Sequence, residues 1–92
     1  MKRDKKFYIN SIKMDLFRIV TAAGDTNKKL PTQSIKEFLN HASSEFQKIK
    51  LSKRESFLQS KLQNLNKQLH NLNNQTARLH WAEDILTIRC RL

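Results

Sequence analysis

The sequence predicts an all-α protein, a small helical bundle of three to four helices. The 92 residues include one Gly and one Pro, so long stretches run without a helix breaker. A leucine recurs every seven residues through the second half, and apolar stripes with helical spacing occupy the first half. The alternating apolar residues at 86–92 also fit a strand, but no other segment supplies a convincing partner strand. Helix is therefore preferred throughout.

The first helix is expected over about residues 5–23, with Gly24 ending it in the left-handed conformation. Its inward stripe consists of Ile9, Ile12, Leu16, Ile19, Val20 and Ala23. Phe7, Met14 and Phe17 form a second apolar stripe almost opposite the first. Only one of the two faces can meet the core of a small bundle. The second face is either covered by another helix of the chain or forms an interface, and the interface is preferred.

The second helix is expected over about residues 34–49, after a polar loop at 25–31. Ser34 and Glu37 have the spacing of a capping box. The apolar residues of this segment lie within one face, and they are Ile35, Phe38, Leu39, Ala42, Phe46 and Ile49. This one-sided pattern is typical of a helix that packs on a core while its other face meets solvent.

The third helix is expected over about residues 53–72, beginning at a second capping box made by Ser52 and Glu55. It carries a leucine-rich seam that consists of Leu51, Leu58, Leu62, Leu65, Leu69 and Leu72. The Asn-rich stretch at 71–76 has weak helix propensity and predicts a break, followed by a fourth helix over about 77–91. The alternative is one continuous helix, which the unbroken repeat of Leu72, Leu79 and Leu86 supports.

The seam favours a core helix over a leucine zipper. A zipper needs a second apolar residue between successive leucines of the seven-residue repeat. Glu55, Thr76 and Glu83 occupy this second position, so it is apolar over only part of the seam. The apolar face at 35–49 also argues against a solvated basic helix that would read DNA. The seven-residue repeat is thus expected to face other helices of the same chain.

The charge balance is strongly basic, with 18 Lys and Arg against 8 Asp and Glu and a formal net charge of +10. Such a charge attracts polyanions, whether an acidic protein, nucleic acid or an anionic membrane surface, although a solvated basic surface explains it equally. We expect a single domain over 1–92, with residues 1–5 forming a flexible basic tail. The candidate anion contacts are Lys2, Arg3, Lys5, Lys6, Arg78 and Arg89.

The sequence contains no constellation that indicates catalysis, a cofactor or a metal. His41, His70 and His80 are 29 and 10 residues apart, which does not place two imidazoles on one helical turn. Glu83 and Asp84 are adjacent and diverge by about 100° on a helix, unlike an acid/base pair. The protein is expected not to be an enzyme and to have no small-molecule substrate. One cysteine and the lack of a long apolar run favour a cytoplasmic protein without integral membrane association.

These observations predict a small interaction or regulatory protein. It is expected to form a homodimer and to present a basic helical surface to an acidic protein partner. The candidate interface residues are Phe7, Met14, Phe17 and Trp81. The alternative is a protein that binds nucleic acid without sequence specificity, through contacts of Lys and Arg with phosphates.

Overall fold

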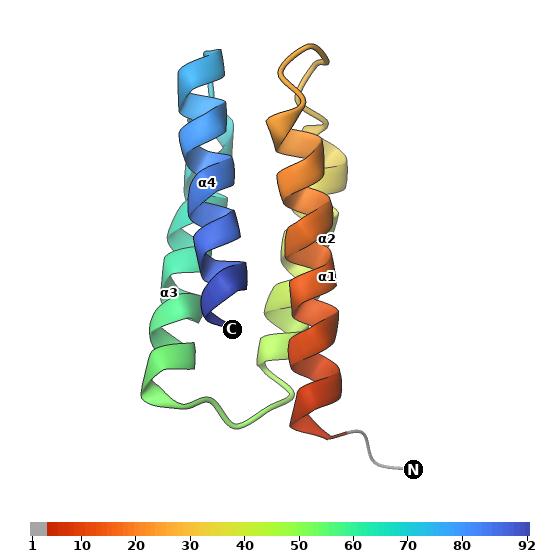
Figure 1. Cartoon of the computed structure of the whole chain (residues 1–92), viewed down its shortest axis with the longest axis vertical. Coiled ribbons are helices and arrows are strands. Elements are labelled where there is room, and N and C mark those ends of the chain that lie inside the picture. Colours follow the sequence, from red (N-terminus) through yellow and green to blue (C-terminus); the bar gives the residue numbers. More distant parts are fainter. Residues whose placement is uncertain (1–3) are drawn as a thin grey trace.

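The computed structural model describes residues 4–92 as four helices with no strand in this range. They are α1 (Lys5–Gly24), α2 (Thr32–Phe46), α3 (Lys53–Gln68) and α4 (Gln75–Arg91), with a short 3-10 turn, η1 (Leu69–Asn71), after α3. Figure 1 shows the helices running alternately up and down, with α1 and α4 in front of α2 and α3. The prediction of an all-α bundle is confirmed.

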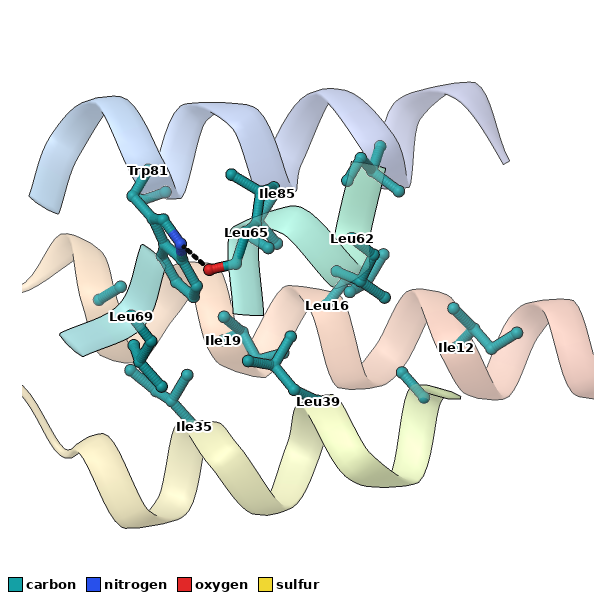
Figure 2. Close-up of a cluster of buried hydrophobic side chains, with 14 of the residues drawn as sticks. Ile12, Leu16, Ile19, Ile35, Leu39, Leu62, Leu65, Leu69, Trp81 and Ile85 are labelled. Carbon is teal, nitrogen blue, oxygen red and sulfur yellow. Dashed lines mark hydrogen bonds between the residues drawn. The ribbon is translucent and has the colours of Figure 1, made fainter. Parts of the chain in front are cut away.

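Each helix packs against two neighbours: α1 and α3 both contact α2 and α4. Apolar side chains from all four helices meet in one core (Figure 2). Its largest fully buried members are Phe46, Ile12, Leu16, Ile19, Ile35, Leu39, Leu58, Leu62, Ile85 and Ile88. Each such side chain contributes about 1.5–3 kcal/mol of burial free energy relative to an exposed position. The inward stripes predicted for the first three helices therefore supply most of the core.

The start of α1 is fixed by Asp4, whose carboxylate accepts a hydrogen bond from the N–H of Phe7 at 2.9 Å. Asp4 is thus the cap and Lys5 the first residue of the helix, whereas the rest of the expected basic tail lies outside the described residues. The prediction for Gly24 is wrong, because Gly24 is the last helical residue and no glycine has a positive φ. The chain leaves the helix at Asp25, with φ −83° and ψ 83°, so the turn does not require a left-handed residue.

The bounds of α2 differ from the expected 34–49. The helix begins at Thr32, and Pro31 occupies the cap position without a side-chain hydrogen bond, so the capping box of Ser34 and Glu37 is wrong. Proline favours such an early start because its restricted φ suits a helix N-terminus and it lacks an N–H. At the other end, the N–H of Gln47 bonds to Ser43 and that of Lys48 to Glu45. This tight last turn ends the helix three residues early and directs the chain toward α3.

The second capping box is confirmed. The N–H of Glu55 donates to Ser52 Oγ at 3.2 Å, and the N–H of Ser52 donates to Glu55 Oε1 at 2.9 Å. The helix ends at Gln68 rather than 72, and its leucine seam is buried at Leu58, Leu62 and Leu65, followed by Leu69 in η1. The capping box thus sets the start of a helix whose leucines line the core.

The break in the Asn-rich stretch is confirmed, and the continuous helix is excluded. Asn74 caps α4 by accepting a hydrogen bond from the N–H of Ala77 at 2.8 Å. Because the chain reverses between α3 and α4, the seven-residue repeat does not follow one face. Leu79 and Leu86 are exposed on α4, whereas Trp81, Ala82, Ile85 and Ile88 point inward.

Candidate interaction surface

The outer face of α1 carries large apolar side chains that the bundle does not cover. Phe7, Met14 and Phe17 are all exposed, Met14 by 57% and Phe17 by 56%. They lie on this face because they are seven and three residues apart, while the opposite stripe of the helix is buried in the core. The other helices of the chain thus leave this face of α1 uncovered.

A hollow of about 350 Å³ lies beside this face and is lined by Met14, Phe17, Arg18 and Arg89. Arg89 comes from α4, so the hollow combines two helices that are distant in the sequence but adjacent in the bundle (Figure 1). Met14 and Phe17 supply apolar surface, and the two arginines supply positive charge. The side chains that line the hollow include no carboxylate, as far as residues 4–92 are concerned.

Both arginines are held against aromatic rings. The guanidinium carbon of Arg89 lies 5.6 Å from the ring centroid of Phe17, and that of Arg18 lies 5.8 Å from the ring centroid of Phe38 on α2. Arg89 also donates from Nε to the carbonyl of Lys13 at 3.2 Å. A guanidinium that is oriented in this way loses less entropy when its planar fork binds a carboxylate. The hollow can therefore hold an apolar side chain next to carboxylates.

Further exposed apolar residues lie on α3 and α4. Leu79 and Leu86 are seven residues apart and are exposed by 43% and 41%, so they share one side of α4. Phe57 on α3 is also exposed, although it precedes the buried Leu58. The exposure of Leu79 and Leu86 was not predicted, because the leucine repeat placed both in the core seam, and Phe57 lies outside the repeat.

The expectation for Trp81 as an interface residue is corrected. Trp81 is 2% exposed, and its indole Nε1 donates to the carbonyl of Leu65 at 2.8 Å (Figure 2). The ring therefore joins α4 to α3 inside the core. A buried tryptophan commonly finds such a partner for its N–H, and here the partner is a carbonyl near the end of α3.

The candidate anion contacts have different environments. Lys2 and Arg3 lie outside the described residues, and Lys6 is exposed. Lys5 forms an ion pair with Glu55, with 2.6 Å between Nζ and Oε1. Arg78 is buried and donates to the carbonyls of Lys28 and Asp25. Arg89 lines the hollow described above, so the four candidate cations among the described residues do not form one patch.

The ion pair with Lys5 affects Glu55. The hydrogen bond from the Lys5 ammonium, together with that from the N–H of Ser52, lowers the pKa of the Glu55 carboxyl below its usual value of 4.5. Glu55 is therefore both the capping residue of α3 and the partner of the first residue of α1. This pair links the N-terminal ends of two helices that the core also holds together.

A polar cluster between α1 and α2 was not foreseen. His41 lies with Nδ1 2.5 Å from the carboxylate of Asp15 and with Nε2 3.4 Å from that of Glu45. Both carboxylates are buried, and Ser11 also donates to Glu45 at 3.2 Å. One sequence signal could have found the cluster: Asp15 borders the inward stripe of α1, where an unpaired carboxylate would be costly. α1 and α2 are thus joined by a polar contact whose residues received no role from the sequence.

Within the described chain, no group of three or more His, Cys, Asp or Glu side chains is arranged to hold a metal ion. No helix in this range is long and apolar enough to cross a membrane. No protein-family model, curated protein or solved structure significantly matches the sequence or the fold. The arrangement of side chains on the bundle is therefore the basis for assigning a function.

Proposed function

We propose that the protein is a non-enzymatic interaction protein that binds an acidic protein segment on the outer face of α1 and α4. One observation carries this proposal. Exposed Met14 and Phe17 line a hollow together with Arg18 and Arg89, and both arginines are oriented by aromatic rings. An apolar centre with arginines at its edge is a common composition for the part of an interface that contributes most affinity.

The charge of the molecule supports an acidic partner. Carboxylates of the partner would pair with Arg18 and Arg89, and an apolar side chain between them would contact Met14 and Phe17. The net charge of +10 would accelerate the encounter with such a partner, and the acceleration would decrease with salt. The local arginines would then give specificity that the overall charge does not.

A second copy of the chain fits this face less well. In a two-fold dimer centred on Met14 and Phe17, the same patch would meet itself, so Arg18 and Arg89 of both copies would approach one another. Asp15 approaches Arg18 only at 3.9 Å and is already bound to His41, and the lining itself supplies no carboxylate within residues 4–92, so most of this repulsion would remain. We therefore assign the face to an acidic partner, and the homodimer is one of the outcomes that the experiment distinguishes.

The proposal is tested by fluorescence anisotropy with a labelled amphipathic helical peptide that carries Leu on one face and Glu on both flanks. We expect saturable binding that weakens about tenfold or more in Arg18→Gln and Arg89→Gln, because each loses one charge-assisted contact. Lys53→Gln is the matched control, since it removes one exposed charge at the start of α3 and is expected to bind like the wild type. Circular dichroism verifies that each variant remains helical.

Three results would contradict the proposal. Equal weakening in Lys53→Gln would show that only the total charge matters. Equal binding of a peptide with Gln in place of Glu would show that carboxylates are not recognised. A dimeric mass in light scattering that becomes monomeric in Phe17→Asp would assign the face to a second copy. Labelled duplex DNA, titrated at about 50 and 200 mM salt, tests the nucleic-acid alternative, and a steep salt dependence unaffected by Arg18→Gln would favour it.

A further inference from the structure

A second hollow, of about 380 Å³, lies at the end of the bundle where the loop after α1 meets the start of α4. Its polar lining comes from Lys29, Asn73, Asn74, Gln75 and Arg78. None of the side chains that line it carries a negative charge, as judged from residues 4–92. The hollow is separate from the face of Met14 and Phe17, and an inference about it does not depend on the function proposed above.

Arg78 in this hollow is a buried cation without a counterion. It is 8% exposed, with Nη1 2.8 Å from the carbonyl of Lys28 and Nη2 3.1 Å from that of Asp25. Its Nε is buried and has no hydrogen-bond acceptor, and Arg78 forms no ion pair with any described carboxylate. Burying a charge without a partner of opposite sign costs folding free energy, and a bound anion near Arg78 would reduce this cost.

The N-terminus of α4 borders the same hollow, because Asn74 and Gln75 line it. Asn74 accepts a hydrogen bond from the N–H of Ala77, and its carbonyl accepts one from the N–H of Arg78. The N–H groups of Gln75 and Thr76 precede these bonds and have no partner within the helix. This 17-residue helix has no acidic residue in its first turn, so its positive end is not neutralised there.

We propose that this hollow binds a phosphate group. The anion would accept hydrogen bonds from the N–H groups of Gln75 and Thr76 and from Lys29 Nζ, and it would lie against the guanidinium of Arg78. Its charge would compensate Arg78, and its several oxygens suit donors that come from different directions. The bound group would join the loop after α1 to the start of α4, two segments that Arg78 already connects through Lys28 and Asp25.

Nuclear magnetic resonance of the full-length protein tests this inference. Inorganic phosphate and, separately, glycerol 3-phosphate are titrated at constant ionic strength maintained with sodium chloride. We expect saturable shifts of the Gln75 and Thr76 amides and of the Arg78 Nε–H. Tighter binding of inorganic phosphate identifies the free ion as the ligand, and tighter binding of the ester identifies a phosphate carried by a small molecule. Shifts that do not saturate with either probe would overturn the proposal.

Two variants separate binding from folding. Lys29→Gln removes one exposed donor and is expected to weaken phosphate binding about three- to tenfold. Gln75→Glu places a carboxylate in the first turn of α4, which suits the helix but repels a bound anion, so binding is expected to be lost while the fold is kept. Lys53→Gln, at the opposite end of the bundle (Figure 1), is expected to bind like the wild type. Equal affinity of Gln75→Glu and the wild type would contradict the assigned site.

Discussion

At the level of single residues, His41 is the most informative polar group, because it joins two buried carboxylates across the α1–α2 interface. Asp15 and Glu45 come from different helices and would repel each other without a donor between them. Arg18 and Lys48 approach the same carboxylates only at 3.9 and 3.6 Å. The half-exposed imidazole therefore makes the closest contact to the Asp15 carboxylate. At Glu45 it adds a second contact beside the hydrogen bond from the Ser11 hydroxyl.

Replacing His41 tests this role. His41→Ala is expected to lower the free energy of unfolding by about 1–2 kcal/mol, because a buried carboxylate loses its donor. Urea denaturation at pH 7 measures the change, and His70→Ala serves as the control, since His70 is exposed in η1 and forms no contact of this kind. An equally small change, below about 0.5 kcal/mol, in both variants would show that His41 does not stabilise the carboxylates.

Glu55 gives a pH dependence whose sign is fixed by its lowered pKa. A carboxyl that is more acidic in the folded state stabilises the protein above its unfolded pKa, and this stabilisation disappears as the pH falls through the folded value. The stability difference between the wild type and Glu55→Gln is therefore expected to be largest near neutral pH and to shrink below about pH 4.5. Urea denaturation from pH 7 to pH 3 measures it.

Lys5→Gln is the complementary variant for Glu55. Because the Lys5 ammonium is the main cause of the shift, removing it is expected to raise the pKa of Glu55 toward its usual value in a carboxyl-carbon titration. The hydrogen bond from the N–H of Ser52 would keep part of the shift. An unchanged titration curve would show that the capping box alone sets the acidity of Glu55.

At the level of elements, the reversal between α3 and α4 decides which leucines stabilise the bundle. Leu65 and Leu79 belong to the same seven-residue series, yet Leu65 is buried and Leu79 is exposed. The helical phase restarts at Asn74, whose side chain caps α4, and the new phase points Trp81 and Ile85 inward instead. The Asn-rich stretch thus separates repeat leucines that are buried, before it, from repeat leucines that are exposed, after it.

The two leucines form a matched pair for mutation. Leu65→Ala is expected to cost about 2–5 kcal/mol in unfolding free energy, since it leaves a cavity in the core. Leu79→Ala makes the same chemical change at an exposed position and is expected to cost within about 0.5 kcal/mol. Thermal and urea denaturation measure both. Similar large costs for the two variants would indicate a continuous leucine seam rather than a reversal.

At the level of the whole molecule, the bundle buries one face of α1 and leaves the other to solvent. Ile19 lies in the core, whereas Phe17, two residues earlier, is exposed beside Arg89. A bundle of four short helices cannot bury both apolar faces of α1. An uncovered apolar face that includes Phe7, Met14 and Phe17 is typical of an interaction site. The same helix therefore supports both the fold and the proposed interface.

This difference predicts opposite results for two neighbouring substitutions. Phe17→Asp is expected to leave the helical circular dichroism and the unfolding midpoint nearly unchanged, because its side chain remains in solvent. Ile19→Asp buries a carboxylate without a partner and is expected to abolish cooperative unfolding. Loss of helicity in Phe17→Asp would show that the α1 outer face is part of the core in solution.

The sequence by itself determined the helical class, the inward stripes, the capping box at Ser52 and the break before α4. These features depend on local propensity and periodicity, which neighbouring residues encode. The early start of α2 at Thr32, after Pro31, and the ordinary turn after Gly24 were missed, because several local solutions compete at helix ends. The outer stripe of α1 was also found from spacing alone.

The tertiary structure decided which side chains meet across helices. It placed Trp81 against the carbonyl of Leu65, paired Asp15 with His41 and moved Leu79 out of the seam. It also brought Arg89 to Phe17, and Arg78 to the loop after α1. Such contacts join residues separated by 16 to 76 positions, as for Trp81 with Leu65 and Arg89 with Lys13. Periodicity defines the faces of each helix, but only the packing of four helices determines which faces are opposed and which remain for a partner.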